Sequence, residues 1–451
     1  MDKEGIMPSI HAISLGCPKN RVDTETLLAG LRRYYPDMEV VAELSLADVI
    51  IINTCGFIEP AVEESVRTIL DAAAELDEAG NGSRPLLVVT GCLPGRYGVD
   101  ELAKELVEVD LFLGPMELGD WPEKISTALG QRGISREAAL PGAVEMRELS
   151  TGPSYAYLKI SEGCDRSCSF CTIPAIRGPF HSRPMAELEA EARELLDKGV
   201  KELVLVGQDV SSYGKDLQGP TNLITLLETL LPLEGLHWLR PMYLYPAGLT
   251  PELLGFMRDM EQDSPLVPYF DVPLQHAHED ILKAMGRPFS RDPHAVVERI
   301  RSYLPHAALR TSLIVGFPGE SETHFTVLKD FVIQSRFHNL GVFPFWPEQD
   351  TVAANLSDQV DQERKSVRQQ EIMALQADIS AEILGESLGE ELDVLVDAPH
   401  PDWPGLYTGR AWFQAPEVDG VTYVSGPGVT AGAMVRAVIE DTATYDLTAL
   451  T

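Results

Sequence analysis

The sequence predicts an α/β protein built from an N-terminal flavodoxin-like parallel sheet, a partial (β/α)6 barrel and a small C-terminal antiparallel β-barrel. Short continuous apolar runs alternate with segments of helical period, three times before about residue 122 and six times from 151 to 383. From residue 386 onward the chain changes to short strands separated by glycine and proline. At 451 residues the chain is also too long for one ordinary domain.

The first part, 8–122, repeats the order strand, cysteine, helix. The apolar runs of "IHAISLGCPKN", "ADVIIINTCGF" and "PLLVVTGCLPG" end at Cys17, Cys55 and Cys92, and an amphipathic segment follows each. The loops after parallel strands lie at one edge of a sheet, so these three cysteines are expected to meet although they are far apart in sequence. Each cysteine also lies near a helix N-terminus, which favours the thiolate that metals bind.

The second part, 151–383, follows a linker at 123–150 that is rich in glycine, serine and alanine. Its six expected strands are "AYLKI", "ELVLVG", "HWLRPMYLY", "VPYFDVPL", "LRTSLIVGF" and "NLGVFPFW". In the helix after the first strand, Leu188, Ala192, Leu195 and Leu196 share one face, and Gly199 provides the C-terminal stop. The active site of such a barrel is expected at the C-terminal ends of its strands.

The third part, 386–451, contains the expected strands "ELDVLVD", "YTGRAWFQ", "GVTYVSG" and "AMVRAVIEDTATYDL". This pattern is typical of a small barrel similar to an oligonucleotide-binding fold. Arg410 and Arg436 stand there against eleven acidic residues, a net charge of −9.

Composition excludes some classes of protein. The net charge is −33, which repels phosphate backbones and favours basic partners, although acidity can also serve solubility alone. No apolar run has the length of a membrane span, and the N-terminal "MDKEGIMPSI" lacks the apolar core of a secretion signal. We therefore expect a cytoplasmic protein without a membrane partner, whose six cysteines are metal ligands or catalytic groups rather than disulfides.

Three cysteines, Cys164, Cys168 and Cys171, lie in "SEGCDRSCSFCTIPAIRG", directly after the first barrel strand. A zinc site would favour paired ligands and four protein groups. Buried structural cysteines would not need this fixed spacing. An iron–sulfur cluster bound by three thiolates leaves one iron open for a small molecule, and this interpretation is the favoured one.

The spacing and position of this motif, with Phe170 before its third cysteine, resemble the radical S-adenosylmethionine (SAM) superfamily. The resemblance implies that the open iron of a 4Fe–4S cluster binds SAM, and that the reduced cluster cleaves SAM to a 5′-deoxyadenosyl radical. That radical abstracts hydrogen from an unreactive carbon, while the protein positions the reactants and excludes water.

Loops after two further strands offer contacts for SAM. Gly207 and Gln208 follow the second strand and suit the methionine end, while Ile314, Gly316 and Glu320 follow the fifth and suit the adenine. The alternative is that glycine and proline simply form the loop turns.

Cys17, Cys55 and Cys92 would make a second three-thiolate site. They could instead be unrelated buried cysteines. However, they occupy the same place in successive βα units, and the chain's only other cysteines belong to the radical motif. A second open cluster could present sulfur to a carbon radical.

The chain as a whole resembles the radical SAM methylthiotransferases. The resemblance rests on the motifs "SLGCPKNRVDTE", "NTCGFIEPA", "TGCLPGRY", "SEGCDRSCSFCTIPAIRG", "VGQDVSSYG", "DVPLQHA" and "IVGFPGESE". It implies an N-terminal methylthiotransferase domain, a radical SAM core, a C-terminal TRAM domain, two 4Fe–4S clusters and SAM. One SAM would methylate sulfur at the second cluster and another would generate the radical.

Members of this family differ in substrate. The MiaB type modifies an adenosine in transfer RNA, and the RimO type modifies the β-carbon of an aspartate in a small-subunit ribosomal protein of the uS12 type. The tract "APEVDGVTYVSG" resembles the RimO form of the TRAM domain. The acidic TRAM domain suits a basic ribosomal protein or the ribosome better than RNA, because RNA-binding proteins offer several Lys/Arg contacts to phosphate. A reducing partner such as flavodoxin or ferredoxin is also expected.

Some positions depart from the family pattern. "FWPEQDT", at 345–351, replaces a tract usually close to "YSPEEGT", and His181 stands where arginine is common, although Arg177 and Arg183 remain. His276 is expected to orient its loop rather than act as an acid or base. Apart from the transfer-RNA enzyme, the alternatives are a non-catalytic iron–sulfur redox or sensor protein and a structural zinc protein.

Overall fold

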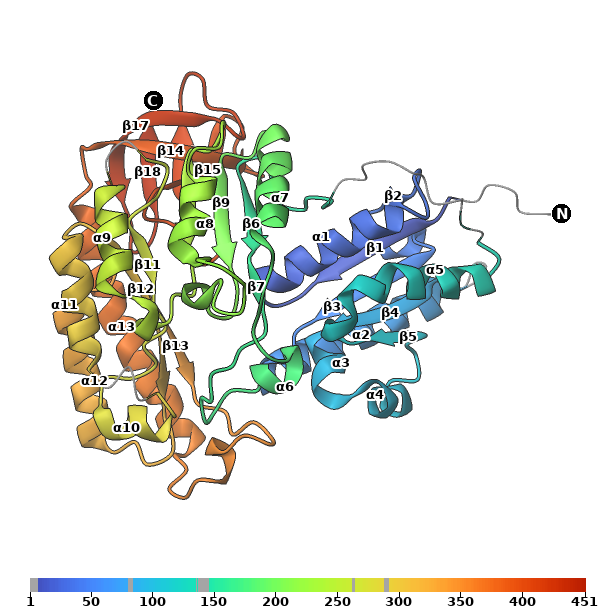
Figure 1. Ribbon diagram of the computed structural model, residues 1–451, viewed down its shortest axis with the longest axis horizontal. Coiled ribbons are helices and arrows are strands. Elements are labelled where there is room, and N and C mark those ends of the chain that lie inside the picture. The colour runs from blue at the N-terminus through green and yellow to red at the C-terminus, as the bar shows by residue number, and fades with distance from the viewer. Residues whose placement is uncertain (1–6, 80–83, 135, 137–145, 262–263, 288–291) are drawn as a thin grey trace. The chain divides into compact units, whose positions relative to one another are not determined.

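The computed structural model describes residues 7–79, 84–134, 136, 146–261, 264–287 and 292–451 (Figure 1). The chain forms two compact units. The first comprises the chain up to Ser150 together with Gly163–Asp165 and Thr172–Phe180, and the second comprises the remainder. Two short pieces of the radical-motif region, which the sequence places in the second part, thus pack with the first unit.

The core of the first unit is a parallel sheet, as the sequence predicts. It has five strands in the order β2-β1-β3-β4-β5, two more than the three that the sequence marks, namely β2 and β5. Its strands are β1 Ser9–Ser14, β2 Glu39–Val40, β3 Val49–Thr54, β4 Leu86–Gly91 and β5 Leu111–Leu113. The central strands β3 and β4 are buried along their whole length because helices cover both faces of the sheet.

Alternate residues of each strand face opposite layers of helices. Val49 and Ile51 pack toward α1 (Pro18–Arg32) and α5 (Trp121–Gln131), whereas Ile50 and Ile52 pack toward α2 (Glu59–Ala79) and α4 (Val99–Glu105). The helices of this unit are α1 Pro18–Arg32, α2 Glu59–Ala79, α3 Cys92–Tyr97, α4 Val99–Glu105, α5 Trp121–Gln131 and the short α6 Ile173–Arg177.

Helix α5 occupies the start of the segment 123–150 that the sequence suggested as a linker. Its Trp121, Ile125 and Leu129 are fully buried in the same core as α1. Residues 135 and 137–145 of that segment lie outside the described residues. The boundary at residue 122 stays a prediction.

The second unit contains the partial barrel, formed by two three-stranded parallel sheets in the orders β10-β9-β6 and β11-β12-β13. The six strands are β6 Tyr155–Lys159, β9 Glu202–Val206, β10 Trp238–Pro241, β11 Tyr269–Asp271, β12 Ala308–Val315 and β13 Asn339–Pro344. A bridge between Leu239 and Leu266 leads from the first sheet toward the second. Each expected strand is therefore present.

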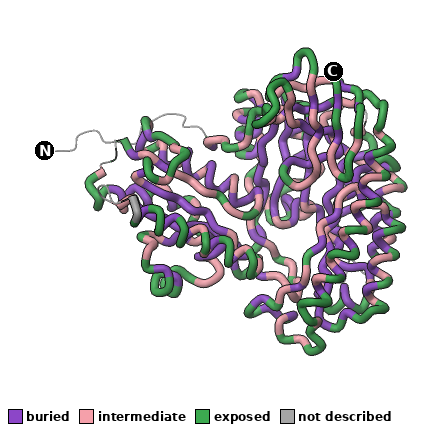
Figure 2. The backbone as a smooth tube through the Cα atoms, turned by 180° about the vertical axis from the view of Figure 1, so that it is seen from behind, coloured by how far each residue is buried: buried purple, intermediate pink, exposed green. Residues whose placement is uncertain are grey.

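Helices alternate with these strands, and a two-stranded sheet flanks the barrel. The helices are α7 Met185–Asp197, α8 Leu223–Leu230, α9 Pro251–Asp259, α10 Glu279–Ala284, α11 Pro293–Tyr303, α12 Glu322–Ser335 and α13 Gln362–Gly385. The flanking strands are β7 Ser161–Glu162 and β8 His181–Ser182. Figure 2 shows the barrel strands buried and the outer turns of the helices exposed.

Helix α13 leads into a closed five-stranded barrel in the order β14-β15-β16-β18-β17. The strands are β14 Glu391–Pro399, β15 Leu406–Ala411, β16 Thr422–Ser425, β17 Met434–Thr442 and β18 Leu447–Leu450. The sequence predicts an antiparallel barrel, and four of the five strand pairs are antiparallel, but β16 and β18 run parallel. Within the described residues, no helix combines the length and apolar character needed to cross a membrane.

Candidate functional site

Cys17, Cys55 and Cys92 lie at the carboxyl ends of three neighbouring strands. Cys17 caps the N-terminus of α1, Cys55 directly follows β3, and Cys92 is the first residue of α3. Because β1, β3 and β4 are adjacent in the sheet, their ends share one edge. The structure thus brings together the three cysteines that the sequence placed there.

Glycines let the three cysteine loops approach closely. A Cβ at Gly16, where φ is +82°, would lie 2.7 Å from Cys55 Cβ and 3.0 Å from its Sγ. A Cβ at Gly56 would lie 2.9 Å from the Cys92 carbonyl group. Any side chain at either position would push two of the cysteines apart.

Two asparagines hold the loops in register. Asn20 donates from Nδ2 to the carbonyl oxygens of Leu15 and Thr54, at 2.9 Å each. Asn53 donates from its own Nδ2 to Asn20 O at 2.8 Å and to Thr24 Oγ1 at 3.0 Å. These bonds tie the loop after β1 to the end of β3 and fix the places of Cys17 and Cys55.

The electrostatics of the three thiols are coupled. Burial opposes ionisation of Cys17, but the positive charges of Lys19 and Arg177 and nearby backbone N–H groups outweigh it, so the pKa of Cys17 lies below its usual value. Burial raises the pKa of Cys55 to about 11, and the neighbouring Cys92 and Cys17 add to the rise. Burial also raises the pKa of Cys92, against the effect of Arg177. Ionising all three thiols therefore requires a strongly positive partner, as bound metal provides.

A buried arginine contacts one of these thiols, which the sequence did not reveal. Arg177 Nε lies 3.3 Å from Cys92 Sγ, and Arg177 Nη1 donates to Asp23 Oδ2 at 2.8 Å. Sequence reasoning singled out Arg177 only as one of the basic residues retained near Gly178. Its neighbour Cys92 stands 85 positions away in the chain.

The cysteines of the second motif are divided between the two units. Cys164 belongs to the first, where its N–H donates to Gly178 O at 3.2 Å. Cys168 and Cys171 belong to the second, where a turn joins them through a 3.2 Å bond from Cys171 N to Cys168 O. Arg287 Nη1 lies 3.7 Å from Cys168 Sγ, a second contact between an arginine and a cysteine that the sequence did not reveal.

Backbone bonds anchor the turn that carries Cys168. Ser169 N donates to Met285 O at 3.0 Å, and Ser169 O accepts from Ala353 N at 2.8 Å. Gly286, where φ is +71°, is needed here because a Cβ would lie 2.7 Å from Ser167 O. The turn is thus held against the end of α10.

Two arginines of this region contact the same aromatic ring. Arg287 and Arg166 place their guanidinium carbons 4.5 Å and 3.9 Å from the centroid of the Tyr245 ring. Arg166 is itself oriented by two bonds to Asp209 Oδ2, at 3.0 and 2.8 Å. Cation–π contacts of this kind favour cations and restrict their position.

Of the residues expected to contact SAM, Phe170 and Ile314 lie in one apolar cluster with Phe317 and Phe345. This cluster would suit a flat apolar ring such as adenine. Phe170 stays partly exposed, whereas Ile314 is 9% exposed.

Gly207 and Gln208 lie just past β9, beside β7. A Cβ at Gly207 would come 2.5 Å from Ser161 Oγ, so glycine is required for this approach. Gln208 donates from Nε2 to Glu162 Oε1 at 2.8 Å. Among the residues that the structure describes, the buried atoms Gln208 Oε1 and Ser161 Oγ have no hydrogen-bond partner, which is costly unless a ligand supplies one.

Glu320 and Gly316 have partners within the protein. Glu320 Oε2 accepts from Gly316 N at 2.7 Å, and Oε1 accepts from Arg368 Nη1 at 2.9 Å. Glu320 therefore holds the loop after β12 in place through its bonds to Gly316 and Arg368. His276 Nδ1 accepts from His278 N at 3.0 Å, and burial lowers the pKa of His276, which fits a loop-orienting histidine.

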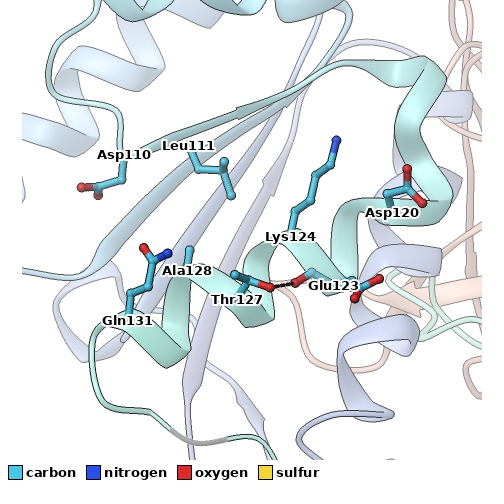
Figure 3. A pocket seen from close by; sticks show the side chains of 8 residues that line it. All are labelled: Asp110, Leu111, Asp120, Glu123, Lys124, Thr127, Ala128 and Gln131. Carbon is cyan, nitrogen blue, oxygen red and sulfur yellow. Dashed lines mark hydrogen bonds between the residues drawn. The ribbon is translucent and has the colours of Figure 1, made fainter.

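The first unit also contains a depression of about 670 Å³ that none of the cysteines lines (Figure 3). Its lining residues are Asp110, Leu111, Asp120, Glu123, Lys124, Thr127, Ala128 and Gln131. Asp110 and Leu111 stand at the start of β5, whereas ligands of parallel sheets bind at the carboxyl ends of the strands. This depression therefore contributes nothing to the candidate site.

The residues present fit the groups that the sequence implies. Each motif offers three thiols, the donor type of iron–sulfur clusters, and the chain has no further cysteine to complete either set. Glycines leave room at the first set, and unpartnered buried oxygens lie beside the second motif in sequence and at the end of β9.

Comparisons with known proteins agree with this description. Residues 158–332 match the radical SAM superfamily, residues 9–114 match the uncharacterized protein family UPF0004, and residues 388–451 match the TRAM domain. A similar solved structure is the radical S-adenosylmethionine methyltransferase TsrM from Kitasatospora setae, with a TM-score of 0.53 and 14% identity over 89% of this chain and 81% of that one. At this identity the likeness concerns the fold alone. The chain is thus a radical SAM protein with a TRAM domain.

Curated relatives are similar over nearly the whole length. The ribosomal protein uS12 methylthiotransferase RimO of Nitratidesulfovibrio vulgaris is 58% identical over 444 residues, 98% of this chain and 100% of the relative. The proteins of the same name from Lawsonia intracellularis and Aquifex aeolicus are 49% and 43% identical, over 98% and 97% of this chain and 97% and 96% of the relatives. The chain belongs to the RimO family of methylthiotransferases.

Proposed function

We propose that the chain is a transferase that adds a methylthio group to the β-carbon of an aspartate in ribosomal protein uS12. The observation that carries the proposal is the placement of Cys17, Cys55 and Cys92 at one sheet edge, in a chain that also carries the three-cysteine motif of a radical SAM barrel. An ordinary radical SAM enzyme needs only the second set. The similarity to relatives named for this activity supports the same conclusion.

We assign one 4Fe–4S cluster to each set of cysteines, with SAM beside the second. Bound there, these groups would supply a carbon-centred radical and a sulfur that can be methylated and transferred. The six thiols hold the irons. Ser161 and Gln208 offer oxygens to the polar end of SAM, and the apolar cluster of Phe170 and Ile314 covers its adenine.

The charges of the TRAM domain favour a basic protein substrate over RNA. Residues 386–451, all of which are described, contain two arginines and no lysine. Arg410 is buried and paired with Glu202 and Asp397, and Arg436 lies within 3.2 Å of Glu391. At most the exposed Arg436 is available to a phosphate, whereas sequence-independent RNA binding depends on several such contacts.

The proposal includes a one-electron donor, for which flavodoxin or ferredoxin has suitable chemistry. A ribosomal substrate would place the reaction in the cytoplasm.

Anaerobic reconstitution tests the enzyme class. We expect about eight iron atoms per chain and formation of 5′-deoxyadenosine when SAM and dithionite are added. The Cys168→Ala chain should lose this product, whereas Cys55→Ala should still form it but fail to transfer a methylthio group. Zinc in place of iron, or no 5′-deoxyadenosine, would instead indicate a structural or redox protein.

Mass spectrometry tests the substrate. In a strain that lacks the native enzyme, expression of this chain should restore the mass of one methylthio group on a uS12 aspartate and leave transfer-RNA adenosines unchanged. The Cys55→Ala chain is the matched control and should not restore the methylthio group on uS12. A methylthio group on transfer RNA instead would assign the chain to the MiaB type of reaction.

A further inference from the structure

The contact between Arg177 and Cys92 is built into the interior of the first unit. The Arg177 side chain is 2% exposed and that of its partner Asp23 is 1% exposed. Arg177 uses each of its nitrogens: Nε faces Cys92 Sγ at 3.3 Å, Nη1 donates to Asp23 Oδ2 at 2.8 Å, and Nη2 donates to Asn20 Oδ1. The planar fork is thus fixed, and its Nε–H is directed at the sulfur.

The helix that supplies this arginine packs tightly on the helix that begins with Cys92. Arg177 is the last residue of α6, and Cys92 is the first residue of α3. A Cβ at Gly95, in α3, would lie 3.0 Å from Ile176 O. At the other end of α6, Thr172 Oγ1 donates to Phe57 O at 3.2 Å, two residues after Cys55. The contact is therefore held from both ends of the helix.

A positive N–H donor at a ligand sulfur changes how easily an iron–sulfur cluster accepts an electron. Hydrogen bonds to the sulfurs and the local net charge set the reduction potential, because both favour the more negative, reduced form. The effect is strong in a buried site, where solvent does not screen the charge. Asp23 carries a negative charge, which opposes reduction of the cluster and therefore lowers the reduction potential.

We propose that Arg177 sets the reduction potential of the cluster held by Cys17, Cys55 and Cys92, raising it through its bond to Cys92. This inference rests on the proposed function, which places a cluster at these cysteines. Arg177 is a positioning residue for this cluster, and the negative charge of Asp23 lowers the reduction potential that Arg177 raises. The residue that adjusts the first cluster lies six positions after Cys171, within the radical motif itself.

The test uses the full chain with Cys164, Cys168 and Cys171 replaced by alanine, so that one cluster remains. Reconstituted protein is titrated with dithionite and redox mediators, and the reduced fraction is followed by electron paramagnetic resonance. Each reduction adds one electron from dithionite to the cluster. If this background holds no 4Fe–4S cluster, the proposed function fails before Arg177 is tested.

In this background, Arg177→Met should lower the ratio of reduced to oxidised cluster about tenfold at a fixed potential, a shift of about 59 mV to more negative values. Arg177→Lys should shift it in the same direction by less, because the charge stays and the fixed Nε–H is lost. Asp23→Asn should shift it in the opposite direction. A purely structural role would not give opposite signs at the two partners of one ion pair.

Two further variants guard against a simple folding defect. The double change Arg177→Met with Asp23→Asn leaves neither charge of the pair buried alone. Its reduction potential should lie below that of Asp23→Asn. The difference should equal the one between Arg177→Met and the background protein. Arg287→Met, whose cysteine partner is absent from this background, should leave the potential unchanged. Equal potentials for Asp23→Asn and the double variant, or a shift of the same sign for Asp23→Asn and Arg177→Met, would overturn the inference.

Discussion

Tyr269 of the partial barrel donates its hydroxyl proton to Asp419 Oδ2 of the C-terminal barrel at 2.6 Å. Asp419 belongs to the loop between β15 and β16, and its other oxygen accepts from Arg310 Nη1 at 2.7 Å. The same loop offers its backbone to two further barrel strands: Pro416 O accepts from Tyr157 Oη at 3.2 Å, and Trp412 O accepts from Arg240 Nη1 at 2.7 Å. The TRAM domain is thus tied into the barrel through buried polar contacts.

Removal of the Asp419 carboxylate should destabilise the second unit strongly. Asp419→Ala would leave Arg310, whose side chain is 15% exposed, without its closest partner and the buried Tyr269 without an acceptor. Breaking a fully buried ion pair costs about 3–5 kcal/mol, and we expect a loss near the lower end of that range. Denaturant unfolding of the cluster-free protein measures the loss. Asp402→Ala, in an exposed turn, is the control and should change stability by less than about 0.5 kcal/mol. Equal midpoints for the two variants would show that the loop contributes no stability.

The sequence predicts the strands and the three cysteines at their ends because each apolar run, and the cysteine that follows it, can be recognised within one short stretch of the chain. Cys17, Cys55 and Cys92 each follow an apolar run, and the rule for parallel sheets brings such ends together without further information. The contacts of Arg177 and Asp419 could not be predicted in this way. Each depends on side chains from distant strands or helices, and no spacing in the sequence marks them.

The same limit applies to the residues expected to contact SAM, whose role stays a prediction. The apolar cluster of Phe170 and Ile314 follows from composition, whereas the internal role of Glu320 depends on Arg368, 48 positions away in α13. The tract that includes Asp419 resembles the RimO form of the TRAM domain, and in the structure it also ties the two barrels together.

Gly16 should be needed for the cluster at the first set of cysteines. Gly16→Ala would place a methyl group 2.7 Å from Cys55 Cβ, and we expect reconstituted iron to fall from about eight to about four atoms per chain. Gly98 is a matched control because its φ is also +82° and no atom of the described residues lies within 4 Å of its added Cβ. Gly98→Ala carries only the backbone strain, about 1–2 kcal/mol, and should keep all the iron. Loss of the same amount of iron in both variants would point to strain rather than to collision with Cys55.

The Ser161 hydroxyl should strengthen SAM binding without adding to the stability of the fold. Its buried hydroxyl finds no hydrogen-bond partner in the described part of the chain, so Ser161→Ala should leave the free energy of unfolding unchanged or raise it. If the hydroxyl binds SAM, the same change should weaken the affinity about tenfold, which is the value of one hydrogen bond. Calorimetry with SAM and denaturant unfolding give the two numbers, with the exposed Ser357→Ala as control. An unchanged affinity would remove Ser161 from the proposed SAM site.

His338 should make the stability of the second unit depend on pH. Burial, aided by the positive charge of Arg301, lowers the pKa of His338 to about 4, and the neutral ring accepts a bond from Leu309 N at 3.2 Å. Above its unfolded pKa of about 6.5 the ring is neutral in both states and the fold keeps its full stability. As the pH falls from about 6.5 to about 4, the His338 ring binds a proton in the unfolded chain but stays neutral in the folded chain. The free energy of unfolding therefore falls by about 3 kcal/mol.

The variant His338→Asn isolates this contribution. Asparagine can still accept the bond from Leu309 N but does not titrate, so the parent chain should lose about 3 kcal/mol relative to the variant between pH 7 and pH 4. Other groups that titrate in this range affect both chains alike and cancel in the difference. Denaturant unfolding of cluster-free protein at several pH values supplies the two curves. Curves that stay parallel across the range would mean that His338 is protonated in the folded state and that burial does not hold it neutral.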